Sequence, residues 1–329
     1  MTTNLIRYRL RVGNLIVGLA LVGALSSMAC ASELAALKGH RELILGLAFN
    51  PDGSLLASAS QDGTIRIWDV NKRTEHKVIA GHAKGDYVLS VAFSRDGKSL
   101  ASGSSDKTIK IWSADTGEEK HTLRGHGDSV TSLAFSPTAD ILASSADRDV
   151  ILWQIPGGRR LGAMATESKS AVRLAFSPNG KTLASAGYAK PIQLWNVGSR
   201  SEVARLEGQD RIKIALAYSP DGKSIVSSSG GGSVVVWDLS SRQIRVRIGE
   251  QLKHNILDLA VLPDSNSVLL ASSLGARRWD FAHQRETGVF PVRNGDPGLV
   301  MCLAATRDGK ICAVADDTEI KLFELTASK

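Results

Sequence analysis

The sequence predicts an all-β fold in which seven similar four-stranded antiparallel sheets pack side by side and close into a ring. Two periodic features of the 329 residues carry this prediction: the spacing of the tryptophans and the spacing of turn sequences. The six tryptophans are separated by 44, 41, 42, 42 and 42 residues, and a phenylalanine follows 44 residues after the last one. These aromatic positions are Trp68, Trp112, Trp153, Trp195, Trp237, Trp279 and Phe323. A fixed period of this length indicates repeated units that stack on one another.

A turn sequence ends 13 to 15 residues before each aromatic position. Most of these turns combine Pro or Arg with Asp or Asn and then Gly, whose backbone preferences suit a tight turn. The seven turns are NPDG (50–53), SRDG (94–97), SPTAD (136–140), SPNG (177–180), SPDG (219–222), LPDS (262–265) and TRDG (306–309). Short apolar runs flank each turn, such as ILGLAF (44–49) and SLLASAS (54–60), and they are typical of strands.

Each repeat is therefore predicted to contain a strand, a turn, a second strand, a tight turn, a third strand ending in the aromatic residue, and a weaker fourth strand. HKVIAG (76–81) and KHTLRG (120–125) are examples of the fourth strand. A four-stranded sheet without helices cannot bury both of its faces alone. Seven such sheets around one axis cover each other's faces, and closing the ring leaves no exposed end sheet.

Short motifs give the repeat a recognisable signature. They are the pairs Gly39-His40, Gly81-His82, Gly125-His126, Trp68-Asp69 and Trp237-Asp238. On these motifs the chain resembles the WD-repeat β-propeller family over residues 33–327. The resemblance implies a seven-bladed β-propeller that forms one domain, residues 32–329. Because the last repeat (299–325) supplies only three strands and ELAALKGH (33–40) resembles a fourth, we expect residues 33–38 to complete the seventh blade.

In this family a His before the first strand, a Ser of the second strand, an Asp of the tight turn and a Trp of the third strand form a hydrogen-bonded chain. The implied tetrads are His40, Ser60, Asp62 and Trp68; His82, Ser104, Asp106 and Trp112; and His126, Ser145, Asp147 and Trp153. In such a chain the buried indole N–H finds an acceptor and the carboxylate orients the imidazole. Ser, His and Asp also make up a hydrolase triad. Here each set recurs beside a Trp that occupies the hydroxyl, so we expect structural roles and no catalytic residue.

Later repeats lose this network. Ala189 and Gly231 stand at the positions of the turn Asp in the fourth and fifth repeats, and Gln209 is the nearest remnant of a His. Asp316 and Asp317 remain in the seventh repeat, either as solvated residues or as an acidic spot on the rim.

The first 31 residues differ from the repeats. Arg7, Arg9 and Arg11 precede the apolar run VGNLIVGLALVGAL (12–25), and small residues follow it. This order is typical of a secretory signal peptide, here with cleavage before Ser32. One alternative is an uncleaved membrane anchor, although the run is shorter than the ~20 residues of a spanning helix. Another is a lipoprotein with Cys30 lipidated. We expect an exported protein, periplasmic or extracellular.

Composition and charge argue against several function classes. The chain has 40 Lys+Arg and 33 Asp+Glu; without the three Arg of residues 1–31 the excess is 37 − 33 = +4, too small to indicate nucleic acid binding. The sequence contains no phosphate-binding loop, dinucleotide fingerprint or Cys/His metal spacing, so we expect no cofactor and no metal. Cys302 and Cys312 would be offset by roughly 10 Å on paired strands, so we expect two free, buried thiols.

Propellers of this family usually bind proteins, and the resemblance implies that loops on the narrower face make the contacts. The candidate partner-binding residues are Arg41, Gln61, Lys84, Asp86, Tyr87, Asp128, Lys169, Tyr188, Arg211 and Asp316. The two tyrosines stand out because aromatic residues dominate binding hot spots. We therefore expect a monomeric, non-enzymatic scaffold for other proteins. The alternative is a propeller that binds a ligand or polyanion, or acts as an enzyme, in its central channel, where Arg173 and Asp258 occupy equivalent first-strand positions.

Overall fold

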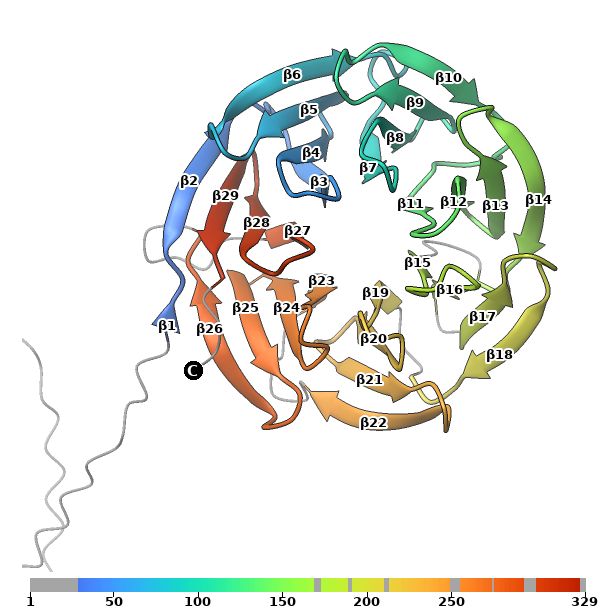
Figure 1. The fold of residues 1–329 in the computed structure, drawn as a ribbon, viewed down its shortest axis with the longest axis vertical. Helices are drawn as coiled ribbons and strands as arrows, with labels where there is room; N and C mark the ends of the chain where they lie inside the picture. The colour runs from blue at the N-terminus through green and yellow to red at the C-terminus, as the bar shows by residue number, and fades with distance from the viewer. Residues whose placement is uncertain are drawn as a thin grey trace, which may run out of the picture.

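Seven four-stranded antiparallel sheets surround a central axis as the blades of a propeller (Figure 1). The structure is a computed structural model that describes residues 29–168, 173–188, 191–209, 213–248, 255–273, 275–292 and 300–325. The all-β, seven-bladed prediction is therefore confirmed. Residues 1–28 of the predicted signal peptide lie outside the described residues.

The blades follow one another along the chain. Blade one contains β3 (Ile44–Phe49), β4 (Leu55–Ser60), β5 (Thr64–Asp69) and β6 (Thr74–Ala80), and blade two contains β7 (Val88–Phe93), β8 (Ser99–Ser104), β9 (Ile109–Ser113) and β10 (Glu119–Leu123). Blade three contains β11 (Ser132–Phe135), β12 (Ile141–Ala146), β13 (Asp149–Gln154) and β14 (Arg159–Ala165), and blade four contains β15 (Arg173–Phe176), β16 (Thr182–Ala186), β17 (Ile192–Asn196) and β18 (Glu202–Leu206). Blade five contains β19 (Lys213–Tyr218), β20 (Ser224–Ser229), β21 (Val234–Asp238) and β22 (Gln243–Ile248), and blade six contains β23 (Ile256–Val261), β24 (Ser267–Ser272), β25 (Gly275–Asp280) and β26 (Arg285–Phe290). Blade seven contains β27 (Val300–Ala305), β28 (Ile311–Asp316), β29 (Glu319–Glu324) and β2 (Glu33–Lys38).

Burial changes from the axis outward. The second strand of each blade is the most buried; every residue of β8, β20 and β24 is buried. Because neighbouring blades cover both faces of these strands, their sequences are almost continuously apolar or small. The fourth strands lie outermost in Figure 1 and alternate between exposed and covered residues, as β22 does. The burial pattern thus follows from each blade's contact with two neighbours.

Each aromatic position packs into the blade before it. Trp112 of blade two shares an apolar cluster with Ile65 and Ile67 of blade one, and Trp68 of blade one shares a cluster with Leu37 and Leu322 of blade seven. The same arrangement recurs around the ring in seven clusters, one for each junction between blades. Burying a side chain of this size contributes roughly 2–3 kcal/mol, so the period in the sequence reflects the period of these junctions.

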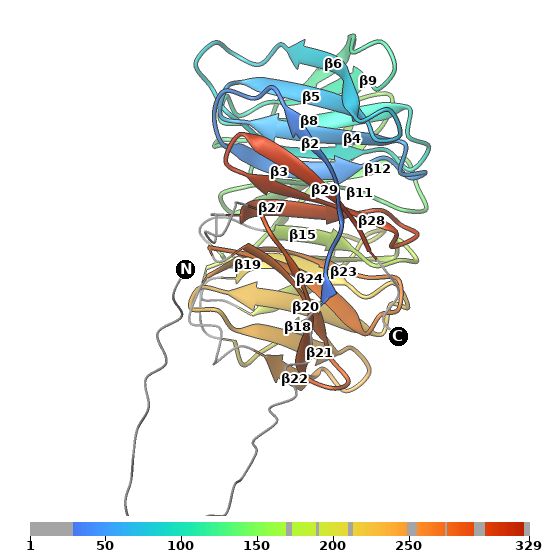
Figure 2. The ribbon, with the colours of Figure 1, turned by 90° about the vertical axis from the view of Figure 1, so that its left-hand side faces the viewer.

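The N-terminal strand closes the ring. β2 pairs antiparallel with β29, with Leu37 opposite Ile320, so residues 33–38 and the last three strands share blade seven, and the predicted closure by residues 33–38 is confirmed. A feature that the sequence did not predict lies just before it: β1 (Ala29–Cys30) pairs in parallel with β26 of blade six. In Figures 1 and 2 this segment continues β2 beyond blade seven to the edge of blade six.

The cysteine prediction is also confirmed. Cys312 lies opposite Ala305 and Cys302 lies opposite Ala315, so the two residues are not cross-strand neighbours. Both are buried free thiols. Burial raises the pKa of each thiol, so both stay protonated and unreactive at neutral pH.

Candidate functional site

The tight turns and the loops that enter the first strands lie together on one face of the ring. The backbone N–H of Gln61 donates to Leu43 O at 2.9 Å, and that of Ser105 donates to Tyr87 O at 3.0 Å, so each turn is tied to the loop beside it. We call this surface the tight-turn face; it comprises the loops 39–43, 61–63, 82–87, 105–107, 126–131, 147–148, 166–168 and 187–188. This face carries most of the residues that the sequence put forward for partner binding.

A buried hydrogen-bonded chain supports this face in blade one. Trp68 Nε1 donates to Ser58 Oγ at 2.9 Å, and Ser58 Oγ lies 2.7 Å from His40 Nε2. His40 Nδ1 lies 2.8 Å from Asp62 Oδ2, and the same carboxylate oxygen accepts a bond from Arg41 N at 3.0 Å. The chain therefore runs from the indole in the core to the backbone of the loop.

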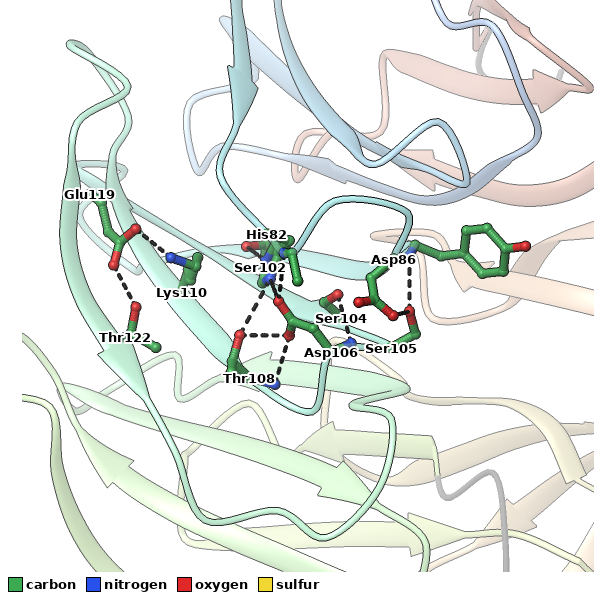
Figure 3. Close-up of polar contacts among 12 residues, drawn as sticks. His82, Asp86, Ser102, Ser104, Ser105, Asp106, Thr108, Lys110, Glu119 and Thr122 are labelled. Carbon is green, nitrogen blue, oxygen red and sulfur yellow. Dashed lines mark hydrogen bonds and ion pairs between the residues drawn. The ribbon is translucent and has the colours of Figure 1, made fainter.

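Blade two repeats this chain, which connects Trp112, Ser102, His82 and Asp106 over distances of 2.7 to 2.9 Å. Figure 3 shows His82, Ser102, Asp106 and Thr108 directed toward one another. Thr108 Oγ1 donates to Asp106 Oδ1 at 2.6 Å, as Thr64 does to Asp62 in blade one. The carboxylate of each turn thus serves both the histidine and its own hairpin.

The structure corrects the identity of the serine in these tetrads. The indole partners are Ser58 and Ser102, not Ser60 and Ser104. Ser60 and Ser104 instead accept bonds from the backbone N–H of Asp62 and Asp106, both at 3.1 Å, and so cap the tight turn. Residues two apart on a strand face the same side, so both serines suited the pattern. The strand register decides between them, because Ser58 lies two residues from Leu56, which pairs with Trp68, whereas Ser60 lies at the strand end.

Blade three departs further from the implied tetrad. Trp153 Nε1 donates to Ser144 Oγ at 2.8 Å, and His126 Nε2 lies 2.7 Å from that hydroxyl, so Ser145 is not the bridging serine. Asp147 does not meet the histidine either, because His126 Nδ1 is buried with no hydrogen-bond partner among the described residues. The hairpin is one residue shorter than in blade one, and Asp147 sits in its two-residue turn with a φ of 47°.

In blades four and five the indole–serine contact is present although the histidine is absent. Trp195 donates to Ser185 at 2.8 Å and Trp237 donates to Ser227 at 2.9 Å, contacts that the sequence did not predict. In blade five Ser227 Oγ donates to Gln209 Oε1 at 2.7 Å, so the glutamine takes the place of the imidazole. Blades six and seven have Leu270 and Val314 at the serine position, and Trp279 Nε1 finds no acceptor in the described part of the chain.

A sequence signal for these serines does exist. Each lies at the end of the same second-strand triplet, and the first residue of the triplet pairs with the tryptophan. The triplets are Leu56-Ala57-Ser58, Leu100-Ala101-Ser102, Leu142-Ala143-Ser144, Leu183-Ala184-Ser185 and Ile225-Val226-Ser227. Aligning the repeats on this strand rather than on the turn aspartate identifies the bridging hydroxyl.

Electrostatics fix the direction of the hydrogen bonds. Burial lowers the pKa of His40 and His82 despite the neighbouring carboxylates, so both rings are neutral at pH 7. Burial acts to raise the pKa of Asp62, but hydrogen bonds from Thr64, Arg41 N and His40 outweigh it and hold that pKa at about 2. The neutral imidazole therefore donates from Nδ1 to the carboxylate and accepts the serine O–H at Nε2, while the serine oxygen accepts the indole N–H. Every member of the chain is satisfied.

This arrangement is incompatible with nucleophilic catalysis. Ser58, Ser102 and Ser144 have no exposed surface, and each hydroxyl is held between an indole and an imidazole. A nucleophile must be reachable by the substrate and free to give its proton to the base. The recurring Ser, His and Asp are therefore structural in the blades where they meet.

The candidate partner-binding residues differ in exposure. Arg41, Lys84, Tyr87, Asp128 and Tyr188 are exposed, and Gln61 and Asp86 are half-buried. Asp316 is buried, with only 7% of its surface exposed, because it ends β28 opposite Val300 and Glu319. The expectation that it is solvated or forms an acidic spot on the rim is wrong. Lys169 and Arg211 lie outside the described residues, as does Ala189.

The two tyrosines are held by similar contacts. Tyr87 is 45% exposed and Tyr188 is 54% exposed, and both belong to the few large apolar side chains exposed in the described part of the chain. Tyr87 N donates to Ser105 Oγ at 2.9 Å, and Tyr188 N donates to Ser168 Oγ at 2.8 Å. Ser105 Oγ in turn donates to Asp86 Oδ1 at 2.8 Å (Figure 3). Each ring is thus presented to solvent from a fixed backbone.

The two channel candidates tie blades together. Arg173 and Asp258 occupy equivalent register positions, opposite Ala186 and Ala271. Arg173 Nε donates to Ile214 O of blade five at 2.7 Å, and Asp258 Oδ2 accepts from Leu303 N of blade seven at 3.0 Å. Burial raises the pKa of Asp258, while the Leu303 N–H and the charge of Arg173 oppose that shift. Both polar groups are used between neighbouring first strands.

The described residues hold no metal site, but they form a groove away from the tight turns. No group of three or more His, Cys, Asp or Glu side chains is placed to hold a metal ion in the described ranges. A polar groove of about 780 Å³ lies between blades one and two on the face opposite the tight turns, lined by residues that include Asn50, Lys72, Asp96 and Lys120. Within the same ranges, no helix has the length and apolar character needed to cross a membrane.

Comparisons with known proteins agree with this geometry. A family model described as the IFT122 first beta-propeller matches residues 72–324, and a model described as WD domain, G-beta repeat matches residues 31–69. Protein Notchless of Drosophila melanogaster is 53% identical over 38 residues, which are 12% of this chain and 8% of the relative. Pre-mRNA-processing factor 19 of Bos taurus is 40% identical over 65 residues (17% and 13%), and Striatin-4 of Homo sapiens is 58% identical over 33 residues (10% and 4%). The chain thus spans a small part of these relatives.

Removing the bridging hydroxyl tests the corrected tetrad. Ser58→Ala leaves both the Trp68 N–H and His40 Nε2 without a partner, so we expect a loss of about 1–3 kcal/mol in the free energy of unfolding, measured by urea denaturation. Ser185→Ala, which strands only the Trp195 N–H, is the matched control and should cost less. Equal losses in the two variants would contradict a role for the histidine link.

Acid should weaken the ring through its buried histidines. Burial lowers the pKa of His126 to about 4, below the value near 6.5 of an unfolded histidine. The unfolded chain therefore binds this proton first, and stability present above about pH 6.5 is lost as the pH falls toward 4. His126→Gln, which copies Gln209 of blade five, should make the urea midpoint fall less between pH 7 and 4.5. If the urea midpoint of His126→Gln falls with pH as steeply as that of the unsubstituted chain, His126 is not the source of the acid sensitivity.

Proposed function

Because the chain belongs to the WD-repeat β-propeller family, we propose that it is an exported scaffold that binds a protein partner on its tight-turn face. Propellers of this family are protein-interaction scaffolds and not enzymes. The observation that carries the choice of surface is the pair of exposed tyrosines, Tyr87 and Tyr188, each held by a serine hydroxyl. Exposed aromatic side chains of this kind are among the residues that most often dominate the binding energy of a protein contact.

Hydrogen bonds order the loop that carries Tyr87 before any partner binds, which favours tight binding. The loop of Tyr87 is fixed by Ser105 and Asp86, and the loop before it is fixed by the contact of Asp106 with Ala83 N at 3.1 Å. A surface ordered before binding loses less conformational entropy on association. Arg41, Lys84 and Asp128 supply exposed charges of both signs around it, which suits a polar rim that selects a partner by charge complementarity.

Export is supported by the composition of residues 1–31. Three arginines, an apolar run and a small-residue end at Ala29-Cys30-Ala31 form the order of a secretory signal. The propeller itself begins with β2 at Glu33, so removal of residues 1–31 leaves every strand of blades one to seven in place.

The tyrosines provide the test of the binding face. We expect the full chain, expressed with an affinity tag, to retain a partner from the cell envelope, and we expect Tyr87→Ala with Tyr188→Ala to weaken that partner's binding by about tenfold or more. Val203→Ala on β18 is the matched control, because Val203 is 49% exposed but lies on an outer strand. Equal loss in the control, or full binding by the double variant, would rule out the tight-turn face.

Processing provides the test of export. N-terminal sequencing of the protein from fractionated cells should give Ser32 as the first residue, in the exported fraction. Replacing Arg7, Arg9 and Arg11 with Glu should retain the uncut chain inside the cell, because the basic start orients the signal. A chain that stays inside the cell with its first residues intact would contradict export. That result would not bear on the tight-turn face, which the tyrosine variants test separately.

A further inference from the structure

The segment before β2 crosses from one blade to the next. β1 pairs in parallel with β26, with Ala29 opposite Gly288 and Cys30 opposite Val289, and Ala31 N donates to Val289 O at 3.2 Å. The next residue turns to blade seven, where Ser32 O accepts a bond from Glu324 N at 3.0 Å. Residues 29–32 thus connect the outer edges of blades six and seven (Figures 1 and 2).

The junction that this segment spans has no indole–serine contact, because blade seven has Phe323 in place of a tryptophan. Its axial side is joined by the bond from Leu303 N to Asp258 Oδ2 at 3.0 Å. Farther from the axis the contact is apolar: Phe290 and Phe323 meet edge to face with ring centroids 5.5 Å apart. Ala31 packs against the cluster that contains both rings. The segment therefore contributes to the apolar, outer part of the junction.

We propose that the outer edge of β26, residues 287–290, is a strand-binding site. Residues 29–31 fill it in the uncut chain, and an extended, uncharged segment of a partner protein fills it once cleavage before Ser32 has removed them. The proposal rests on the processing step of the proposed function. It differs from the tight-turn face in both its position and its mode of recognition, which is backbone pairing at a sheet edge.

The edge has the chemistry that strand addition needs. Val289 O accepts a hydrogen bond from Ala31 N. In a strand the N–H and the C=O of one residue point to the same side, so Val289 presents one donor and one acceptor at the outer edge. Thr287, Gly288, Val289 and Phe290 carry no charge, whereas charges on an edge strand usually block pairing. Glu286, just before them, forms an ion pair with Arg277, whose Nη1 lies 2.7 Å from Glu286 Oε2. Removing residues 29–31 leaves this edge unpaired.

The cluster beside the edge defines the partner's side chain. Ala31 packs against the apolar cluster that contains Phe290 and Phe323, so the segment that replaces it carries a small, uncharged residue there. A charged side chain at that place would lose its hydration against this apolar cluster. The partner is thus an extended peptide that runs parallel to β26.

A peptide titration tests the site directly. A fluorescent peptide with the sequence of residues 25–31 is titrated into the chain 32–329, which contains every strand from β2 to β29, and into the chain 29–329. We expect binding to the shorter chain and at least about tenfold weaker binding to the longer one, because its own segment occupies the edge. The peptide with Ala31→Asp should also bind about tenfold more weakly. Equal binding to both chains would overturn the proposal.

Variants of β26 separate backbone pairing from other contacts. Val289→Pro removes the outward N–H, and proline is tolerated on edge strands, whereas the control Val289→Ala keeps that donor. We expect the peptide to bind Val289→Ala and to be lost from Val289→Pro, with both variants melting within a few degrees of each other. Equal binding by the two overturns strand addition. These measurements use purified protein, so their outcome does not depend on export. A failure of export would show only in the fractionation experiment described above.

Discussion

The structure depends on one packing interaction that recurs at every junction between blades: the aromatic residue that ends the third strand is buried against the preceding blade. No blade can bury its own aromatic residue, because the surface that covers this residue belongs to the preceding blade. The constraint is therefore circular, and it is met only when blade one packs on blade seven. β2 supplies that condition, since Leu37 contributes to the cluster around Trp68.

A second set of contacts joins the blades on the axial side. Equivalent positions of the first strands carry Ser90, Ser132, Arg173, Asp258 and Cys302, and each side chain bonds to the backbone of a blade next in order. A hydroxyl, a guanidinium, a carboxylate and a thiol perform one task. What the site requires is a polar atom that reaches the neighbouring strand, so the residue type is free to vary. This explains why charges occur here without implying a channel ligand.

The sequence was sufficient for the fold because the signals for blade number are periodic and redundant. Turn, strand and aromatic residue all repeat in phase, and the three-stranded last repeat requires the N-terminal strand. The site was predicted less well. Ser58 and Ser60 share a strand face, so only register separates them, and the one-residue shorter hairpin of blade three moves Asp147 away from His126. Asp316 and β1 were missed because burial and edge pairing depend on neighbours far apart in the chain.

The bonds around residues 31 and 32 also bear on the timing of maturation. Ala31 N is held by blade six and Ser32 O by blade seven, on either side of one peptide bond. A peptidase needs the chain around its target to be extended and unoccupied, so the finished ring would protect this bond from cutting. If the chain is processed there, the cut must come before the last blade has been made and has recruited its fourth strand. The speed at which the ring closes would then decide how many molecules escape the enzyme.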